Sequence, residues 1–323
     1  MDYKKVLKGL AYTFVVLILF VFFLVFVQMF SGNLEKFVVW KTLYESSLLG
    51  SIEDAVFGFN AQKNGMRPQR NWEISDLQLN AESGISVLVE PSSDVRKILF
   101  GKTEDKEFPI ASLTKLMTAL IVVENYDLSS AVTIGKFSSL QAGEQGMLEP
   151  GQIFSVKSLL HITLIESSND AAHALSQVAG NENFIHMMNK KASELGMSKT
   201  RFADSSGLSP ESKSSANDLA KLAAYIILNR PEISEITKMP SYDAYMQNGE
   251  FHHTAQSTNK ILGEVSQIVL GKTGYTYVAK ECFLLAKKSP DGNGYIINVV
   301  LGSTDRFVEM KKIINWVQAS YTW

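Results

Sequence analysis

The sequence predicts an α/β fold in which both ends of a domain contribute strands to one sheet and a block of helices is inserted between them. Two short β-rich runs occur at 85–90 and 97–101, and three more at 268–270, 283–286 and 295–301. Apolar residues at mixed three and four spacing fill most of 155–229 between them. Strands from opposite ends of a domain share a sheet only if the chain returns to its start. We therefore expect the helical block to pack on the sheet and to leave a cleft where they meet.

Turn residues and helical spacing set the limits of the other elements. Residues 91–94 separate the first two runs, and 290–294, Pro-Asp-Gly-Asn-Gly, form a strong hairpin turn before the last one. An apolar stripe predicts a closing helix over 307–319. Residues 31–80 are interpreted as a membrane-proximal helix and a linker, so the domain itself is expected over 81–323.

The N-terminus carries a segment with the length of a membrane span. Residues 10–30 are almost wholly apolar, and about 20 such residues cross a hydrocarbon core as a helix. Lys4, Lys5 and Lys8 precede the span, as expected for a cytoplasmic tail over 1–9, although further lysines soon follow it. A cleaved signal peptide is the alternative, but its apolar core is usually shorter, and no clear small-x-small site follows. We expect a single-pass anchor in the cell membrane, with the domain on the extracytoplasmic side.

Composition restricts the class of partner. The chain has 323 residues, 46% of them hydrophobic, which is enough for a large globular domain with its own core. The net charge of -2 and the absence of a long Lys/Arg cluster argue against a nucleic acid partner, because a phosphate backbone normally requires a basic patch. Cys282 is the single cysteine, so we expect no intrachain disulfide and a small buried apolar role for this residue.

Three short motifs, in chain order, place a nucleophile beside a base. Ser112 and Lys115 begin an apolar run, and on a helix the lysine lies one turn along on the serine's own face. Ser167-Ser-Asn169 lies where one helical stretch ends and the next begins. Lys272-Thr273-Gly274 follows a strand-like run, where glycine lets a substrate backbone approach closely.

Two of these motifs have copies elsewhere in the chain. Ser257-Thr-Asn-Lys260 repeats the Ser-x-x-Lys spacing and Ser215-Ala-Asn217 repeats Ser-x-Asn, whereas Lys-Thr-Gly occurs once. The copy at Ser257 neither opens an apolar helix nor follows a hairpin. Order and context therefore favour Ser112 as the nucleophile.

Longer stretches around the motifs resemble the D-alanyl-D-alanine carboxypeptidases, the low-molecular-weight penicillin-binding proteins of peptidase family S11. The resemblance runs from about 82 to 318 and is carried by Phe108–Ala119, Leu148–Gln152, Leu159–Ala172, Leu195–Met197, Phe202–Leu208 and Gly271–Thr276. It implies a β-lactamase/transpeptidase-like fold, with an antiparallel sheet flanked by helices and a helical subdomain inserted. It also implies a cofactor-independent enzyme that removes the terminal D-alanine from peptidoglycan stem peptides and that β-lactam antibiotics acylate.

The resemblance also assigns roles on the nucleophile's side of the site. Ser112 would attack the carbonyl of the terminal D-Ala-D-Ala bond, giving an acyl-enzyme, and Lys115 would take its proton. That requires a neutral lysine, which burial and the nearby cation of Lys272 would favour by lowering the pKa of Lys115. The backbone N–H groups of Ser112 and Tyr275 would form the oxyanion hole.

The other two motifs would bind the substrate and complete the proton path. Ser167 could relay the proton to the departing D-alanine, and the amide of Asn169 could bind the substrate backbone. Lys272 and Thr273 would hold the terminal carboxylate beside Gly274.

Several alternatives and one departure accompany this interpretation. A DD-endopeptidase, a β-lactamase-like hydrolase and a catalytically silent wall-binding module are the competing functions. Class A β-lactamases use a Glu-x-x-Leu-Asn loop, and the sequence has none between Ser167 and Lys272. Lys280 stands where the family commonly has glycine. His252-His253 is interpreted as part of a solvated hairpin rather than as a metal site.

Overall fold

The computed structural model describes residues 68–91, 96–141 and 147–323, which belong to one compact unit that begins at Pro68. The predicted cytoplasmic tail, the span over 10–30 and most of the segment 31–80 lie outside the described residues. Among the residues that are described, no helix has the length and apolar character needed to cross a membrane.

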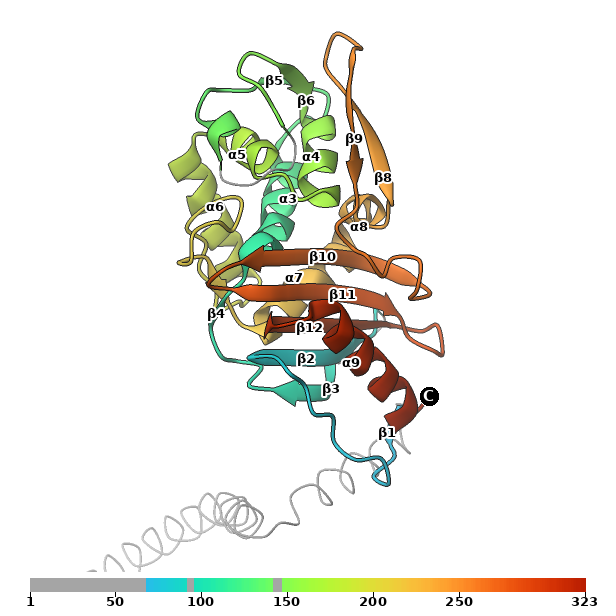
Figure 1. Cartoon of the computed structure of the whole chain (residues 1–323). Coiled ribbons are helices and arrows are strands. Elements are labelled where there is room, and N and C mark those ends of the chain that lie inside the picture. The colour runs from blue at the N-terminus through green and yellow to red at the C-terminus, as the bar shows by residue number, and fades with distance from the viewer. Residues whose placement is uncertain (1–67, 92–95, 142–146) are drawn as a thin grey trace, which may run out of the picture. The chain divides into compact units, whose positions relative to one another are not determined.

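The described elements follow the predicted order of strands, helices and strands (Figure 1). The sheet strands are β2 (Ser83–Val89), β3 (Arg96–Lys102), β10 (Ile268–Thr276), β11 (Lys280–Lys288) and β12 (Tyr295–Ser303). The helices are η1 (Ala111–Leu113), α3 (Thr114–Asn125), η2 (Ser138–Leu140), α4 (Val156–Ile165), α5 (Asn169–Gln177), α6 (Asn181–Glu194), α7 (Ala216–Asn229), α8 (Pro231–Thr237) and α9 (Arg306–Ser320). Short strand pairs are β1 (Gln69–Arg70) with β13 (Tyr321–Thr322), β4 (Phe108–Pro109) with β7 (Lys213–Ser214), β5 (Ala131–Thr133) with β6 (Ile153–Ser155), and β8 (Ser241–Tyr245) with β9 (Phe251–Gln256).

Five strands form one antiparallel sheet in the order β10-β11-β12-β2-β3. The two ends of the domain meet where β12 pairs with β2, with Ile297 opposite Val87 and Val299 opposite Ile85. The predicted α/β fold, with strands from both ends of the domain in one sheet, is confirmed.

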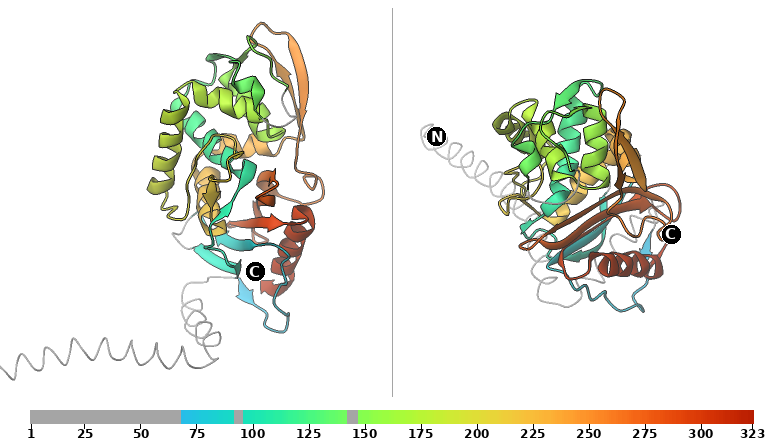
Figure 2. Two further views of the ribbon diagram at one scale, coloured as in Figure 1. Left: turned by 60° about the vertical axis from the view of Figure 1, so that its left-hand side comes forward. Right: turned by 45° about the horizontal axis from the view of Figure 1, so that its top comes forward.

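Both faces of the sheet are covered by helices. Along β12, Ile297, Val299 and Leu301 join the core shared with α3–α8, whereas Ile296 and Val300 join the core beneath α9. This alternation follows from the two-residue period of a strand. Because both faces are buried, β2, β11 and β12 each contain a mainly apolar run in the sequence. Figure 2 shows α9 on one side of the sheet and the α3–α6 block on the other.

The helical block packs around α3, which contacts α4, α5, α6 and α7. The 3-10 turn η1, directly before α3, packs against β10 and β11 at the sheet. Ser155 and Ser168 cap α4 and α5 by accepting backbone N–H hydrogen bonds from Ser158 and Ala171. The sheet and the helical block therefore meet at the residue pair Ser112 and Lys115.

Residues 68–80 belong to the described unit, although we expected them in the linker. Strand β1 pairs with β13, Trp316 Nε1 donates a hydrogen bond to the Ser75 carbonyl, and Leu79 is buried. Arg70 lies 4.4 Å from the centre of the Trp316 ring, within range of a cation–π interaction. The unit therefore begins at Pro68 rather than at residue 81, because its N-terminal strand pairs with the C-terminal one.

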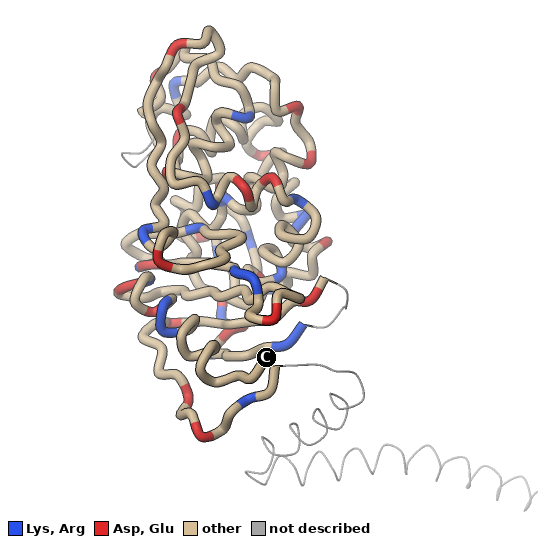
Figure 3. The backbone as a smooth tube through the Cα atoms, turned by 90° about the vertical axis from the view of Figure 1, so that its right-hand side faces the viewer, with Lys and Arg blue, Asp and Glu red and all other residues tan. Residues whose placement is uncertain are grey.

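Charged residues are spread along the chain. In Figure 3, Lys and Arg alternate with Asp and Glu over the sheet and the helical block. Two lysines differ from this pattern because their side chains are fully buried, Lys115 and Lys272. Burying an ammonium group is costly unless it is paired or neutral, so these two positions are candidates for chemistry.

Lys280, the first residue of β11 after the turn from β10, adopts a left-handed backbone conformation, with φ of 53°. Glycine takes such a conformation freely, whereas for another residue it costs about 1–2 kcal/mol. The Lys280 ammonium lies 2.9 Å from a Glu82 carboxylate oxygen, an ion pair that is half exposed and contributes under about 1 kcal/mol. The left-handed turn explains why glycine suits this position.

A Lys280→Gly variant should accordingly be more stable than Lys280→Ala by about 1 kcal/mol, because both lose the ion pair and only glycine relieves the backbone. Urea unfolding of the two variants measures the difference. Equal midpoints would show that the turn is not strained.

Candidate active site

Ser112 lies in η1, at the point where the chain passes from β4 into α3. Its neighbour Ala111 has φ of 46°, an unusual conformation for a residue with a side chain. Gly207 packs closely against this turn, since a Cβ at Gly207 would clash with the Ala111 carbonyl oxygen. Ser112, the candidate nucleophile, therefore lies on a tight turn, and the loop that contains Gly207 packs against this turn.

The Lys115 ammonium nitrogen lies among three oxygen atoms. Nζ is 3.0 Å from Ser112 Oγ, 2.7 Å from Asn169 Oδ1 and 2.8 Å from the Ser206 carbonyl oxygen. The amide oxygen and the carbonyl can only accept. A neutral amine has two N–H groups, which these two acceptors occupy, and one lone pair, which then faces the Ser112 hydroxyl.

Burial lowers the pKa of Lys115 to about 7, and the nearby Asp204 carboxylate opposes that shift. The depressed pKa predicted from the sequence is confirmed. The predicted effect of the Lys272 charge on the pKa of Lys115 is not found. Burial is instead the main cause that lowers the pKa of Lys272, and repulsion from Lys115 and Arg306 lowers it further. A pKa in this range makes the uncharged form of Lys115 accessible at neutral pH.

The second motif lies between α4 and α5. Ser167 has φ of 70°, and its Oγ accepts a hydrogen bond of 2.8 Å from Lys272 Nζ. Asn169 is the first residue of α5, which brings its amide to Lys115. The first and second motifs therefore meet through Asn169, and the second and third meet through Ser167.

The third motif lies on β10, which continues through it to Thr276. Gly274 passes close to the nucleophile turn, since a Cβ there would lie 3.0 Å from both Ser112 N and the Ile110 carbonyl oxygen. Thr273 Oγ1 is 2.6 Å from Thr258 Oγ1. Arg306, at the start of α9, donates from Nη1 to the Gly274 carbonyl at 2.8 Å. The Tyr275 side chain is exposed.

The loop 204–209 is held in shape by one carboxylate. Asp204 accepts hydrogen bonds from the backbone N–H groups of Leu208 and Ser209 and from the hydroxyls of Ser206 and Ser212. The same loop offers the Ser206 carbonyl to Lys115 and the Ser205 carbonyl to the Thr118 hydroxyl of α3. Asp204 thus fixes an acceptor of the lysine and supplies a negative charge that raises the pKa of Lys115.

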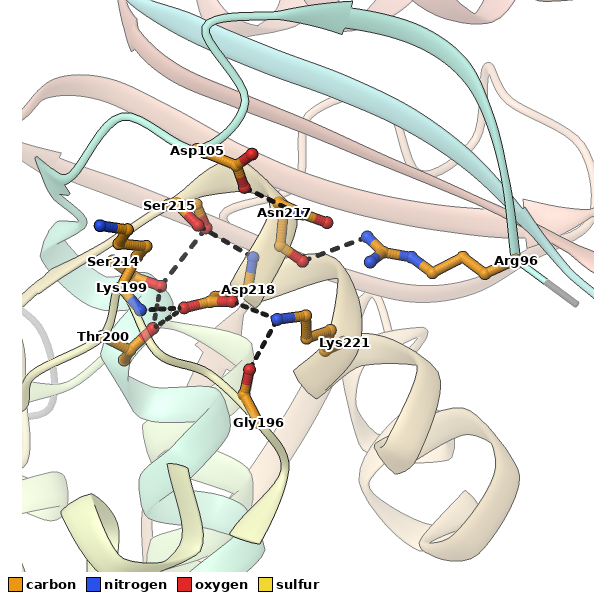
Figure 4. Close-up of polar contacts among 10 residues, drawn as sticks. All are labelled: Arg96, Asp105, Gly196, Lys199, Thr200, Ser214, Ser215, Asn217, Asp218 and Lys221. Carbon is orange, nitrogen blue, oxygen red and sulfur yellow. Dashed lines mark hydrogen bonds and ion pairs between the residues drawn. The ribbon is translucent and has the colours of Figure 1, made fainter. Parts of the chain in front are cut away.

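The segment before this loop is anchored on α7 (Figure 4). Asp218 accepts from the backbone N–H of Lys199 at 2.7 Å and from Thr200 Oγ1 at 3.0 Å. Lys221 joins Asp218 to the Gly196 carbonyl. These contacts at the start of α7 fix the position of the residues that lead into the 204–209 loop, which contacts Lys115.

The serines and the lysine of the copied motifs do not take the places of Ser112, Ser167 and Lys115 in this arrangement. Lys260 is exposed, and Ser215 caps α7 by accepting from Asp218 N. Cys282 is buried and its thiol pKa is raised to about 12 by burial, as expected for a small core residue. In the part of the chain that the structure describes, no group of three His, Cys, Asp or Glu side chains could hold a metal ion.

Sequence reasoning missed three contributors to the site. Ser206 acts through a backbone carbonyl, which has no sequence signature. Arg306 follows the last strand without a motif around it. The pair His252-His253 lies on a hairpin, as predicted, but His253 is not solvated, because it contacts Glu166 beside Ser167.

Comparison with known proteins is consistent with this geometry. The family model of D-alanyl-D-alanine carboxypeptidases, Peptidase S11, matches residues 72–305. The D-alanyl-D-alanine carboxypeptidase DacF of Bacillus subtilis is 32% identical over 257 residues, which are 76% of this chain and 64% of DacF. A D-alanyl-D-alanine endopeptidase of Haemophilus influenzae is 40% identical over 184 residues, 55% of this chain and 62% of that protein. The chain thus spans less than two thirds of the length of these two relatives.

Among solved structures, the Streptomyces K15 DD-transpeptidase superimposes with a TM-score of 0.69 at 28% identity, covering 76% of this chain and all of that one. The transpeptidase-like fold expected from the sequence is therefore found. With the family model covering most of the described residues, the chain belongs to the D-alanyl-D-alanine carboxypeptidase family, peptidase S11.

Proposed function

We propose that the protein is a serine-type D-Ala-D-Ala carboxypeptidase that removes the terminal D-alanine from peptidoglycan stem peptides. The observation that carries the proposal is the environment of Lys115. A buried lysine with a pKa of about 7 lies 3.0 Å from a serine hydroxyl, and its two N–H groups have other acceptors. That is the arrangement a general base needs to activate a serine nucleophile.

In the acylation step, Ser112 Oγ attacks the carbonyl carbon of the D-Ala-D-Ala bond while Lys115 Nζ takes the hydroxyl proton. The oxyanion that develops is stabilised by the backbone N–H groups of Ser112 and Tyr275, a kind of donor worth about 3 kcal/mol each. The short approach of Gly274 to Ser112 N supports this pairing. The C–N bond then breaks, leaving an ester on Ser112.

The departing amine needs the proton that Lys115 has taken. Ser167 lies between the two lysine motifs, with its Oγ bound to Lys272, and would relay that proton to the nitrogen. Water then hydrolyses the ester, with Lys115 acting as base again. The terminal carboxylate of the substrate would be bound by Lys272 and Thr273. Its negative charge would favour the protonated form of Lys272, whose pKa is lowered without substrate by burial and by the charges of Lys115 and Arg306.

The proposal is tested by incubating the protein with a stem pentapeptide, a crosslinked peptide dimer and nitrocefin. The carboxypeptidase releases free D-alanine from the pentapeptide faster than it turns over the other two. Turnover of nitrocefin alone would indicate a β-lactamase, and no covalent labelling by penicillin would favour a catalytically silent wall-binding module.

An endopeptidase is the second candidate function. The relative from Haemophilus influenzae that carries this name is 40% identical to the chain over its matched region. An endopeptidase would cleave the crosslinked dimer faster than the pentapeptide, so the same experiment separates the two activities.

We further propose that β-lactam antibiotics acylate Ser112, and that residues 10–30 anchor the protein in the cell membrane with the catalytic domain outside. The apolar length of 10–30 and the lysines that precede it support the anchor. Extraction of the full chain from membranes only by detergent, and protection of residues 1–9 from external protease, would test this topology.

The rate should rise with pH through about 7 and then level off, because the base form of Lys115 is the reactive one. Asp204→Asn removes the negative charge that raises the pKa of Lys115, so the rising limb should move to lower pH. Profiles of kcat/KM between pH 5 and 9, for the original protein and for Asp204→Asn, measure the position of the rising limb. A limb that stays in place or moves to higher pH would contradict the assignment of Lys115 as the base.

A further inference from the structure

The backbone at Ser167 is held in a conformation that it does not prefer. Its φ of 70° lies in the left-handed region, which costs a serine about 1–3 kcal/mol. Such a conformation persists only where the surroundings enforce it. After Ser167, the backbone is fixed by Ser168, which caps α5. Before Ser167, it can be fixed only by contacts of Glu166 and Ile165.

Glu166, at the end of α4, is bound by a histidine from the β8–β9 hairpin. His253 Nε2 lies 3.0 Å and 3.1 Å from the two carboxylate oxygens of Glu166. The Glu166 side chain is 10% exposed and that of His253 is 15% exposed. A hydrogen bond to a carboxylate with so little solvent is stronger than one at the surface.

A second histidine sets the orientation of the His253 ring. His252 Nδ1 lies 2.7 Å from His253 Nδ1, and the two rings are nearly perpendicular. When His252 donates in this contact, His253 Nδ1 accepts, and the proton of a neutral His253 is on Nε2, facing Glu166. The His252 ring is itself packed edge-on against Phe154 of β6.

The chain after His253 reaches both sides of the site. Thr258 N donates to the Ile165 carbonyl at 3.1 Å, directly before Glu166. The Thr258 hydroxyl also contacts Thr273 on β10. The hairpin and the residues after it therefore connect the Ser167 turn to the strand that carries Lys272.

From these contacts we propose that His253 is a positioning residue, whose hydrogen bonds to Glu166 hold Ser167 in its left-handed conformation within reach of Lys272. The catalytic part of this inference rests on the proposed function, whereas the positioning part does not. His253 does not touch the substrate or the reacting atoms. Its loss would displace Ser167, and a displacement of about 1 Å at a reacting group can cost up to about 100-fold in rate.

The test compares three variants of the full chain. His253→Leu removes the donor, and His253→Gln keeps an N–H group at similar reach. His161→Leu is the matched control, because His161 also joins α4 to the hairpin, by packing on Tyr242, but does not touch Glu166. Hydrogen–deuterium exchange of peptides covering 163–171 reports the turn, and D-alanine release from a stem pentapeptide reports catalysis.

We expect His253→Leu to speed exchange over 167–171 and to lower kcat at least about tenfold, with KM within about threefold of the original protein. His253→Gln should restore both, and His161→Leu should change neither. Should the leucine variant not fold, His253→Asn, whose amide is too short to reach Glu166, replaces it.

Unchanged exchange over 167–171 in His253→Leu would overturn the inference, as would an equal effect of His161→Leu. Faster exchange in a protein whose parent releases no D-alanine would instead reject the proposed function and leave the positioning role intact.

Discussion

Replacing Ser112 with alanine is expected to lower D-alanine release by about 10⁴-fold or more and to abolish covalent labelling by a fluorescent penicillin. The reason is that Ser112 Oγ, 3.0 Å from Lys115 Nζ, is the hydroxyl that the proposed base activates. Labelling is measured on a gel, and D-alanine by a coupled assay.

Ser257→Ala is the control for this experiment. Ser257 belongs to the copy of the Ser-x-x-Lys motif, but its Oγ accepts from the backbone N–H of Asn259, and Lys260 is exposed. This variant should keep full labelling. Persistent labelling of the Ser112→Ala protein would show that another residue is the nucleophile.

Replacing Lys115 with arginine should slow acylation by about 10²–10⁴-fold. Arginine can still donate hydrogen bonds to the oxygen atoms around this position. Its guanidinium, however, stays protonated and has no lone pair to accept the Ser112 proton. Lys115→Met should lose activity to a similar degree and also leave Asn169 Oδ1 and the Ser206 carbonyl without this donor. The acylation rate constant with penicillin measures both.

Raising the pH separates the two explanations for the loss. Loss of a base predicts that the arginine variant stays slow up to pH 10, because its side chain cannot deprotonate in that range. Lys260→Arg at the exposed copy should behave as the unmodified protein. An arginine variant within tenfold of the original rate would mean that Lys115 acts only through its charge.

The motif residues could be predicted to meet because of the elements that carry them. Ser112 precedes α3, Asn169 begins α5, and Lys272 lies on β10, and strands from both ends of the chain had to share a sheet. The apolar periodicity thus predicted the helices and strands, and the motifs predicted which polar residues on them form the site.

The rest of the site has no local signature. Ser206 contributes a backbone carbonyl, and any residue could supply one. His253 reaches Glu166 across 87 positions of sequence, so that only the packing of the β8–β9 hairpin on α4 brings them together. The strand β10 also extends through Lys-Thr-Gly-Tyr-Thr, because burial beside η1 accommodates polar residues that an isolated sequence pattern does not mark as strand.

Identifying the acylated residue tests most directly whether Ser112 is the nucleophile. The protein is incubated with penicillin at pH 8, digested and analysed by tandem mass spectrometry. We expect the added mass on Ser112 and on no other residue, and no labelling of the Lys115→Arg variant on the same time scale. An adduct on Ser257 or Ser167, or equal labelling of the Lys115→Arg variant, would contradict this expectation.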